Sequence, residues 1–146
     1  MSAHDVVDAR LMGADCVLLI VAALDDVELG DFHALASQIG LDVLVEVHDE
    51  AEADRAMQIG ATILGVNQRD LVTFEVDTER AVRVAQAMPA GVIRVAESGI
   101  GGPSDIPALV DAGFDAVLVG ESLVTQDGQS NGVADLIAAA GGAQTG

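Results

Sequence analysis

Five short apolar runs recur along the chain, and they constrain its fold more than any other feature. They begin near residues 16, 42, 62, 92 and 116, roughly 20 to 30 residues apart. Runs this rich in Val, Ile and Leu are typical of parallel strands that are covered on both faces. The runs are Cys16–Val21, Val43–His48, Ile63–Asn67, Val92–Gly99 and Ala116–Ser122. We therefore predict five parallel strands in an α/β fold.

The stretches between these runs are amphipathic and carry signals for the start and end of helices. Asp49, with Glu52 three residues later, and Asp77 can cap helices through their side chains. Glycines and one proline follow the apolar stretches and stop them. The predicted helices span residues 6–12, 31–39, 50–59, 78–88, 103–112 and 133–140.

Strands that alternate with helices are joined by right-handed crossovers into a parallel sheet. The length of 146 residues fits one domain, which we place at residues 1–140, followed by a disordered tail at 141–146. Five strands do not close an eight-stranded barrel, so the first and last strands keep free edges. The sheet is therefore either an open doubly wound fold or part of a barrel.

The charge balance excludes some classes of function. Six arginines and no lysine stand against 24 acidic residues, for a net charge of −18, and the aromatic residues are three Phe. A nucleic-acid partner is disfavoured because basic patches and aromatic stacking residues are both lacking. Two explanations of the acidity stay open: a salt-rich cytoplasm that screens the charges, or a GC-rich coding sequence that replaces Lys with Arg.

The remaining composition suggests a soluble cytoplasmic protein. A lone cysteine, Cys16, excludes an intrachain disulfide and suits a reducing compartment. The apolar runs are too short to span a membrane, and the first residues lack a basic signal region. His4, His33 and His48 show no metal-ligand spacing, so we expect neither a metal nor a cofactor.

Polar residues stand at or near the ends of four of the five apolar runs, and parallel strands bring such ends to one rim of the sheet. Glu46, between two valines, is either a general base or a carboxylate paired with an arginine. Asn67 is either a turn residue or a hydrogen-bonding group for a substrate. Glu97 is either a structural acid or a second active-site carboxylate, whose proximity to Glu46 would raise one of the two pKa values. His48 shares the strand face of Glu46, although a loop role is the simpler interpretation.

Small-residue loops follow the last two strands. The loops Ser98–Gly102 and Gly120–Ser122 can hold a phosphate through backbone N–H groups, because glycine lets the backbone approach an anion closely. Amide donors would also let a strongly acidic protein bind an anionic substrate. The predicted phosphate-binding residues are Ser98, Gly99, Gly101, Gly120 and Ser122.

Six segments, taken together and in order, resemble indole-3-glycerol phosphate synthase. The resemblance runs from about Val6 to Ala140 and implies a partial TIM (β/α)8 barrel of five parallel strands alternating with helices, the fourth to eighth strands of the family. The segments are Gly13–Leu24, Leu44–His48, Gly65–Leu71, Phe74–Asp77, Ala96–Ile100 and Val119–Leu123.

The resemblance implies a carbon–carbon lyase of tryptophan biosynthesis. The family closes the indole ring of 1-(2-carboxyphenylamino)-1-deoxyribulose 5-phosphate, with loss of carbon dioxide and water. By resemblance Glu46 is the catalytic base, Asn67 binds substrate, and Glu97 contacts the sugar hydroxyls. Ser98 also binds substrate, and Arg69 either binds the substrate carboxylate or pairs with Asp70.

The family's first three strands supply catalytic lysines, including the general acid, and this chain has no lysine. We therefore expect the chain to be inactive alone and to need either a separate N-terminal half or a second copy at its strand edges. Two alternatives stay open. One is another phosphate-binding barrel enzyme, such as a phosphoribosylanthranilate isomerase-like chain, and the other is a non-catalytic phosphate-binding half-barrel that dimerises.

Overall fold

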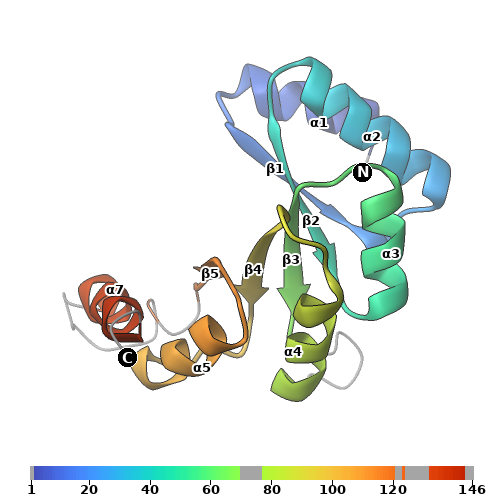
Figure 1. Cartoon of the computed structure of the whole chain (residues 1–146). Helices are drawn as coiled ribbons and strands as arrows, with labels where there is room; N and C mark the ends of the chain where they lie inside the picture. Colours follow the sequence, from blue (N-terminus) through green and yellow to red (C-terminus); the bar gives the residue numbers. More distant parts are fainter. Residues whose placement is uncertain (1, 70–76, 121–122, 124–131, 144–146) are drawn as a thin grey trace.

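The five predicted strands form one parallel sheet. The computed structural model describes residues 2–69, 77–120, 123 and 132–143 (Figure 1). Every neighbouring pair of strands is parallel, and the strands follow each other across the sheet in chain order. The strands are β1 (Cys16–Ile20), β2 (Asp42–Val47), β3 (Ile63–Asn67), β4 (Ile93–Glu97) and β5 (Ala116–Leu118).

This strand order decides between the two architectures left open by the sequence. A doubly wound sheet reverses direction partway and places helices on both faces. Here the order β1-β2-β3-β4-β5 never reverses. Helix α2 packs on β1 and β2, α3 packs on β2, and α4 packs on β3. Figure 1 shows an open arc of strands with α1 to α4 along its outer side, the arrangement of a partial β/α barrel.

The helices largely follow the predicted pattern. Their bounds are α1 (Ala3–Leu11), α2 (Asp26–Gln38), α3 (Glu50–Gln58), α4 (Thr78–Ala87), α5 (Ile106–Asp111) and α7 (Gly132–Ala143), with 3-10 turns η1 (Val21–Ala23) and η2 (Pro103–Asp105). Asp49 and Asp77 cap α3 and α4 as predicted, each accepting a backbone N–H. Three helix boundaries were predicted wrongly: α1 begins at Ala3 rather than at Val6, and the start of α2 and the end of α7 also differ.

Helix α2 begins at Asp26 rather than at Asp31. Its N-cap is Asp25, whose carboxylate accepts the N–H groups of Val27 and Glu28 at 2.9 Å, and Glu28 reaches back to the Asp25 N–H. This reciprocal capping box satisfies donors that would otherwise lack partners. Helix α7 continues to Ala143, through the glycine pair expected to end it, and residues 144–146 lie outside the described part.

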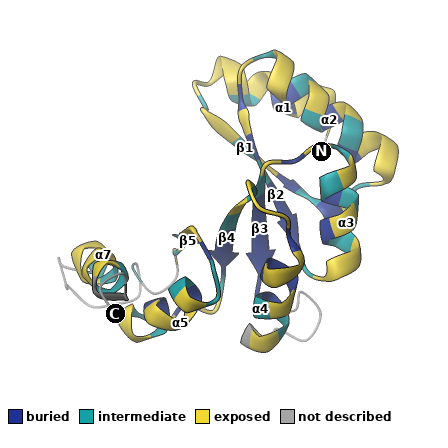
Figure 2. Cartoon of the chain, in the orientation of Figure 1, coloured by how far each residue is buried: buried dark blue, intermediate teal, exposed yellow. Residues whose placement is uncertain are grey.

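The two faces of the sheet differ in how they are covered. Side chains that point toward the helices are fully buried, such as Leu19, Val45 and Leu64. On the inner face of the arc, Leu18, Ile93 and Leu118 are 36%, 46% and 51% exposed. Figure 2 shows the buried residues gathered where strands and helices meet. The expectation of strands covered on both faces is therefore wrong for the inner face of the described residues, because five strands do not close around it.

Within the described residues, none of the helices combines the length and the apolar character that crossing a bilayer would require.

Candidate active site

Three polar side chains lie at the carboxyl ends of adjacent strands. Glu46 is near the end of β2, and Asn67 and Glu97 are the last residues of β3 and β4. Asn67 lies directly beside Glu97 in the strand register. Their exposed fractions are 5%, 7% and 3%, so all three are buried polar groups, which are costly without partners. The structure brings them together on one rim, as the sequence predicts.

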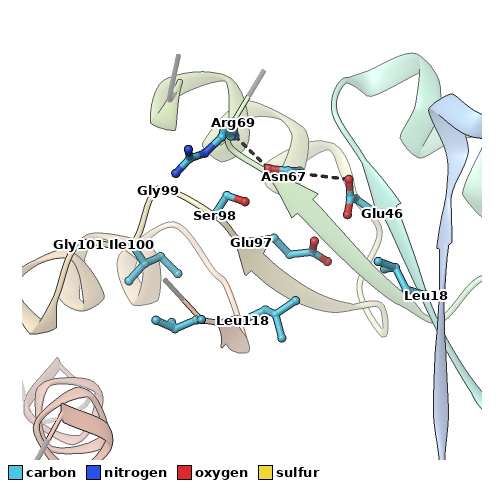
Figure 3. A pocket seen from close by; sticks show the side chains of 12 residues that line it. Leu18, Glu46, Asn67, Arg69, Glu97, Ser98, Gly99, Ile100, Gly101 and Leu118 are labelled. Atoms are coloured by element: carbon cyan, nitrogen blue, oxygen red, sulfur yellow. Dashed lines mark hydrogen bonds between the residues drawn. The ribbon is translucent and has the colours of Figure 1, made fainter. Parts of the chain in front are cut away.

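These side chains line a hollow of about 670 Å³ that opens on the inner face of the arc (Figure 3). The two glycine loops border the same hollow, so the strand ends and the loops form one site. Every predicted site residue lines it except Ser122, which lies outside the described residues. The lining residues are Leu18, Glu46, Asn67, Arg69, Glu97, Ser98, Gly99, Ile100, Gly101, Leu118, Val119 and Gly120.

Asn67 joins the carboxylate of Glu46 to the loop that follows β3. Its Nδ2 donates to Glu46 Oε1 at 3.1 Å, and its Oδ1 accepts the Arg69 N–H at 3.0 Å. The second bond is an Asx turn, in which a side-chain oxygen takes the place of a backbone carbonyl. Asn67 therefore acts as a turn residue through its side-chain oxygen. Its side-chain nitrogen holds the Glu46 carboxylate at the hollow.

Glu97 lies where a glycine leaves room for its side chain. A Cβ at Gly65 would lie 2.7 Å from Glu97 Cδ and would clash with Oε1. Gly65 is beside Glu46 in the register and two residues before Asn67, so it faces the hollow. Gly65 was not among the predicted site residues, although a glycine inside an apolar strand often marks a close approach of another group.

The surroundings of Glu97 favour its protonated form. Burial, a hydrogen bond with Glu46 and the charge of Glu46 raise the pKa of Glu97 from an ordinary 4.5 to about 8. Glu97 is therefore largely protonated at pH 7 and can donate a hydrogen bond. Among the described residues, its Oε1 has no hydrogen-bond partner, which leaves it available to a ligand.

Ser98 and Gly99, at the start of the first glycine loop, both have a left-handed backbone. Their φ angles are 60° and 67°, and Ser98 is the one described non-glycine residue with positive φ. This conformation costs a residue with a side chain about 1–2 kcal/mol. The Ser98 carbonyl accepts a hydrogen bond from Gln68 Nε2 at 3.2 Å, which helps to fix it. Such strain is concentrated at functional sites.

The first glycine loop offers fewer free amides than the sequence suggested. The Gly101 N–H donates to Asp105 Oδ2 at 2.8 Å, across the start of η2. A phosphate would have to displace this carboxylate to use the Gly101 amide. Gly99 and Gly120 both line the hollow.

Arg69 carries the one Lys or Arg side chain among the described residues of the lining. Asp70, the alternative partner named by the sequence analysis, lies outside the described residues. Among the described residues, the site included, no three His, Cys, Asp or Glu side chains come together in a way that could hold a metal ion.

Comparisons with known proteins give a consistent result. Residues 1–136 match the family model of indole-3-glycerol phosphate synthase. The chain is 51% identical over 136 residues to the indole-3-glycerol phosphate synthase of Mycobacterium sp. strain KMS, covering 93% of the chain and 50% of that protein. Against indole-3-glycerol phosphate synthase 1 of Streptomyces coelicolor it is 50% identical over 139 residues, covering 95% and 52%. The chain thus spans about half the length of the curated relatives it matches.

Solved structures of low sequence identity share the fold. The 3-hexulose-6-phosphate synthase of Salmonella typhimurium superposes with a TM-score of 0.82 at 14% identity, over 97% of this chain and 68% of that one. A thiamine phosphate pyrophosphorylase from Pyrococcus furiosus gives 0.76 at 19% identity, over 94% and 65%. These similarities support a partial TIM barrel.

Proposed function

The chain belongs to the indole-3-glycerol phosphate synthase family, and on that premise we propose that it supplies one half of that enzyme's active site. The reaction is closure of the indole ring of 1-(2-carboxyphenylamino)-1-deoxyribulose 5-phosphate, with loss of carbon dioxide and water. The observation that supports this most is the convergence of Glu46, Asn67 and Glu97 with two glycine loops around one hollow.

The paired carboxyl groups suit the proton transfers of this reaction. Forming the ring requires a base to remove a proton and an acid to protonate the departing hydroxyl. Glu46 is the proposed base, and Asn67 orients its carboxylate. Glu97, with its raised pKa, can donate a hydrogen bond to a sugar hydroxyl. The proton donor for the departing hydroxyl is the lysine that the family resemblance places on an earlier strand.

The substrate's two anionic groups have separate proposed partners. The phosphate is held by backbone N–H groups of the glycine loops at Ser98, Gly99, Gly101, Gly120 and Ser122, with the Gly101 amide exchanging Asp105 for phosphate. Arg69 binds the carboxylate that leaves as carbon dioxide. Amides hold the phosphate without adding charged side chains, and the arginine fork fixes the orientation of the aromatic ring.

Turnover needs a second segment, because this chain has no lysine. We propose that three further βα units pair with the free edges of β1 and β5 and close the barrel, so that the inner face of the arc lines its interior. The exposed apolar side chains of Leu18, Ile93 and Leu118 support this, since closing the barrel would bury them. A separate N-terminal half would supply the missing lysine, whereas a second copy of the chain has no lysine and would cover only the free strand edges. Small-molecule biosynthesis of this kind would take place in the cytoplasm.

A reconstitution experiment tests the proposal. The chain is mixed with the substrate, with and without the separately expressed N-terminal half of a relative, and indole-3-glycerol phosphate is measured. Turnover only in the mixture, lost in Glu46→Gln but kept in the matched surface variant Glu79→Gln, is the expected result. Binding of a phosphate ester without turnover in either case would instead favour a non-catalytic module, and sedimentation would show whether that module dimerises.

A further inference from the structure

His48 lies between two carboxylates at the start of the β2–α3 loop. Its Nδ1 is 3.0 Å from Glu52 Oε2, and its Nε2 is 3.4 Å from Glu46 Oε1. The three side chains are 13%, 17% and 7% exposed, so solvent screens these contacts little. Glu46 is the proposed base, and His48 reaches it on the same oxygen that receives the Asn67 amide.

Backbone hydrogen bonds hold Glu52 in place beside the imidazole. Glu52 Oε2 accepts the His48 N–H at 2.8 Å, while the N–H of Glu52 donates to the capping carboxylate of Asp49 at 2.8 Å. These two bonds form a reciprocal clasp around the first turn of α3, displaced by one residue from an ordinary capping box. The Glu52 carboxylate is thus fixed by the fold rather than by a mobile surface contact.

The number of protons on the His48 ring decides which of the two carboxylates it can donate to. A neutral imidazole has one N–H and one lone pair, so it can donate to only one of two carboxylates. A donor bond from Nδ1 to Glu52 would turn the Nε2 lone pair toward the Glu46 oxygen. An imidazolium donates to both carboxylates. Among the described residues, the buried Nε2 has no hydrogen-bond partner within the usual distance, so Glu46 at 3.4 Å is the acceptor it faces.

We propose that His48 is a positioning residue for Glu46: as an imidazolium between Glu52 and Glu46, it keeps Glu46 ionised and leaves the proton of the carboxyl pair on Glu97. The catalytic meaning of this assignment rests on the proposed function, but the charge state does not. Burial, a hydrogen bond with Glu46 and the charge of Glu46 all raise the pKa of Glu97, to about 8, so Glu97 is the member of the pair that holds a proton at pH 7.

The charged groups around His48 all favour this charge distribution. Glu46 faces it from β2 and Glu52 from α3, so both of its ring nitrogens meet a carboxylate. Arg55, the basic residue of α3, is turned to Asp26 at 2.6 Å and to backbone carbonyls after β1. Opposite charge at contact distance stabilises the protonated imidazole.

The test is a measurement on the full chain without any substrate. In protein labelled with nitrogen-15 histidine, NMR reports whether each ring nitrogen carries a proton. We expect both nitrogens of His48 to be protonated at pH 7. His33 is the internal control, because burial lowers its pKa and it should be neutral in the same spectrum. A His48 ring that carries one proton at pH 7 would overturn the proposal.

Two variants test the role of the clasp. Glu52→Gln should reduce the share of His48 rings that carry two protons at pH 7, because it removes one of the two facing charges. Glu50→Gln is the matched control: it changes the same charge in the same helical turn, and its carboxylate faces Arg83 at 3.9 Å instead. If both variants changed the protonation of His48 equally, the effect would come from the net charge of the helix and not from direct contact with Glu52. That result would overturn the assignment.

A third variant tests the effect on the carboxyl pair. In His48→Asn, carbon-13 NMR of the glutamate carboxyl groups should show the proton of the pair moving from Glu97 toward Glu46. Titration curves identical to those of the unaltered chain would refute the positioning role. None of these measurements depends on turnover. A charged His48 in a chain that fails the reconstitution would contradict the proposed function alone, and a neutral His48 in a reconstituted active enzyme would contradict this inference alone.

Discussion

Gly65→Ala is the change that tests the carboxyl pair most directly. The added methyl group would occupy the space of the Glu97 carboxyl, with Cδ at 2.7 Å and Cγ at 3.3 Å from the new atom. Backbone movement is restricted, because Gly65 pairs with Glu46 on one side and with Val95 on the other. The Glu97 side chain must therefore leave its position beside Glu46.

The expected loss of stability can be worked out from these contacts. Forcing an extra carbon into a packed site costs about 1–3 kcal/mol. Replacing a strand glycine by alanine stabilises the folded chain by about 0.5–1 kcal/mol, because alanine restricts the backbone of the unfolded chain. The net destabilisation should be about 1–2 kcal/mol. It should be accompanied by a fall of the Glu97 pKa from about 8 toward its ordinary 4.5, because the side chain leaves the buried pair.

A double-mutant cycle separates this clash from other effects of the substitution. The free energy of unfolding is measured by denaturant titration for Gly65→Ala, Glu97→Ala and the double variant. With the Glu97 carboxyl removed, the Gly65→Ala change should become neutral or stabilising by up to about 1 kcal/mol, which corresponds to a coupling energy of about 2 kcal/mol. Gly30→Ala, where the added carbon meets only Ile59 Cγ2 at 3.8 Å, is the control and should stabilise α2 by about 0.5–1 kcal/mol.

An equal cost of Gly65→Ala in the presence and absence of the Glu97 carboxyl would refute the reasoning. The glycine would then serve the backbone of β3 rather than the side chain of Glu97. A pH titration followed by carbon-13 NMR of the glutamate carboxyl groups is a second test. An unchanged pKa of Glu97 in Gly65→Ala would show that its carboxyl group had not moved.

Three further predictions concern pH, backbone strain and salt. Glu97 binds its proton more tightly in the folded chain than in the unfolded chain, so its contribution to stability is lost as pH rises from 4.5 to about 8. Glutamine has no proton to lose. Denaturant titrations should therefore show Glu97→Gln gaining stability relative to the unaltered chain as pH rises across that window. Ser98→Gly and Ser98→Ala both remove the hydroxyl, but at φ 60° the glycine variant should be more stable by about 1 kcal/mol, and equal stability would contradict the strain. With a net charge of −18, the unfolding midpoint should rise as salt is increased from about 0.1 to 1 M, and a flat response would exclude charge repulsion as a stability determinant.

The strands and their order along the chain could be predicted because the pattern is local. Each apolar run is short, bounded by glycine or a capping residue, and separated from the next by a helical stretch, so that each strand of the sheet overlaps one predicted run. Helix starts followed the same logic where a single capping residue was present, as at Asp49 and Asp77. The start of α2 was placed five residues late, at Asp31, because a glycine such as Gly30 is unfavourable inside a helix and the cap at Asp25 is visible only in the structure.

The contacts between strands could not be predicted in the same way. That Glu46, Asn67 and Glu97 share a rim follows from their position at strand ends, but the hydrogen bond from Asn67 to Glu46 depends on register. The commitment of the Gly101 amide to Asp105 was also missed, because a carboxylate four residues later can cap a turn or remain in solvent. Sequence spacing does not distinguish these outcomes.

The register also explains why the site depends on a residue without a side chain. Glu46 lies beside Gly65 in the strand register, whereas Glu97 lies two positions further along, beside Asn67. The carboxyl groups of Glu46 and Glu97 therefore meet only because the Glu97 side chain reaches across β3, and a Cβ at Gly65 would block that path. This contact between the two carboxyl groups raises the pKa of Glu97, and the ionised state proposed for Glu46 depends on it as well. A change at Gly65 should therefore alter the acid–base properties of the site while leaving every ionisable side chain in the sequence.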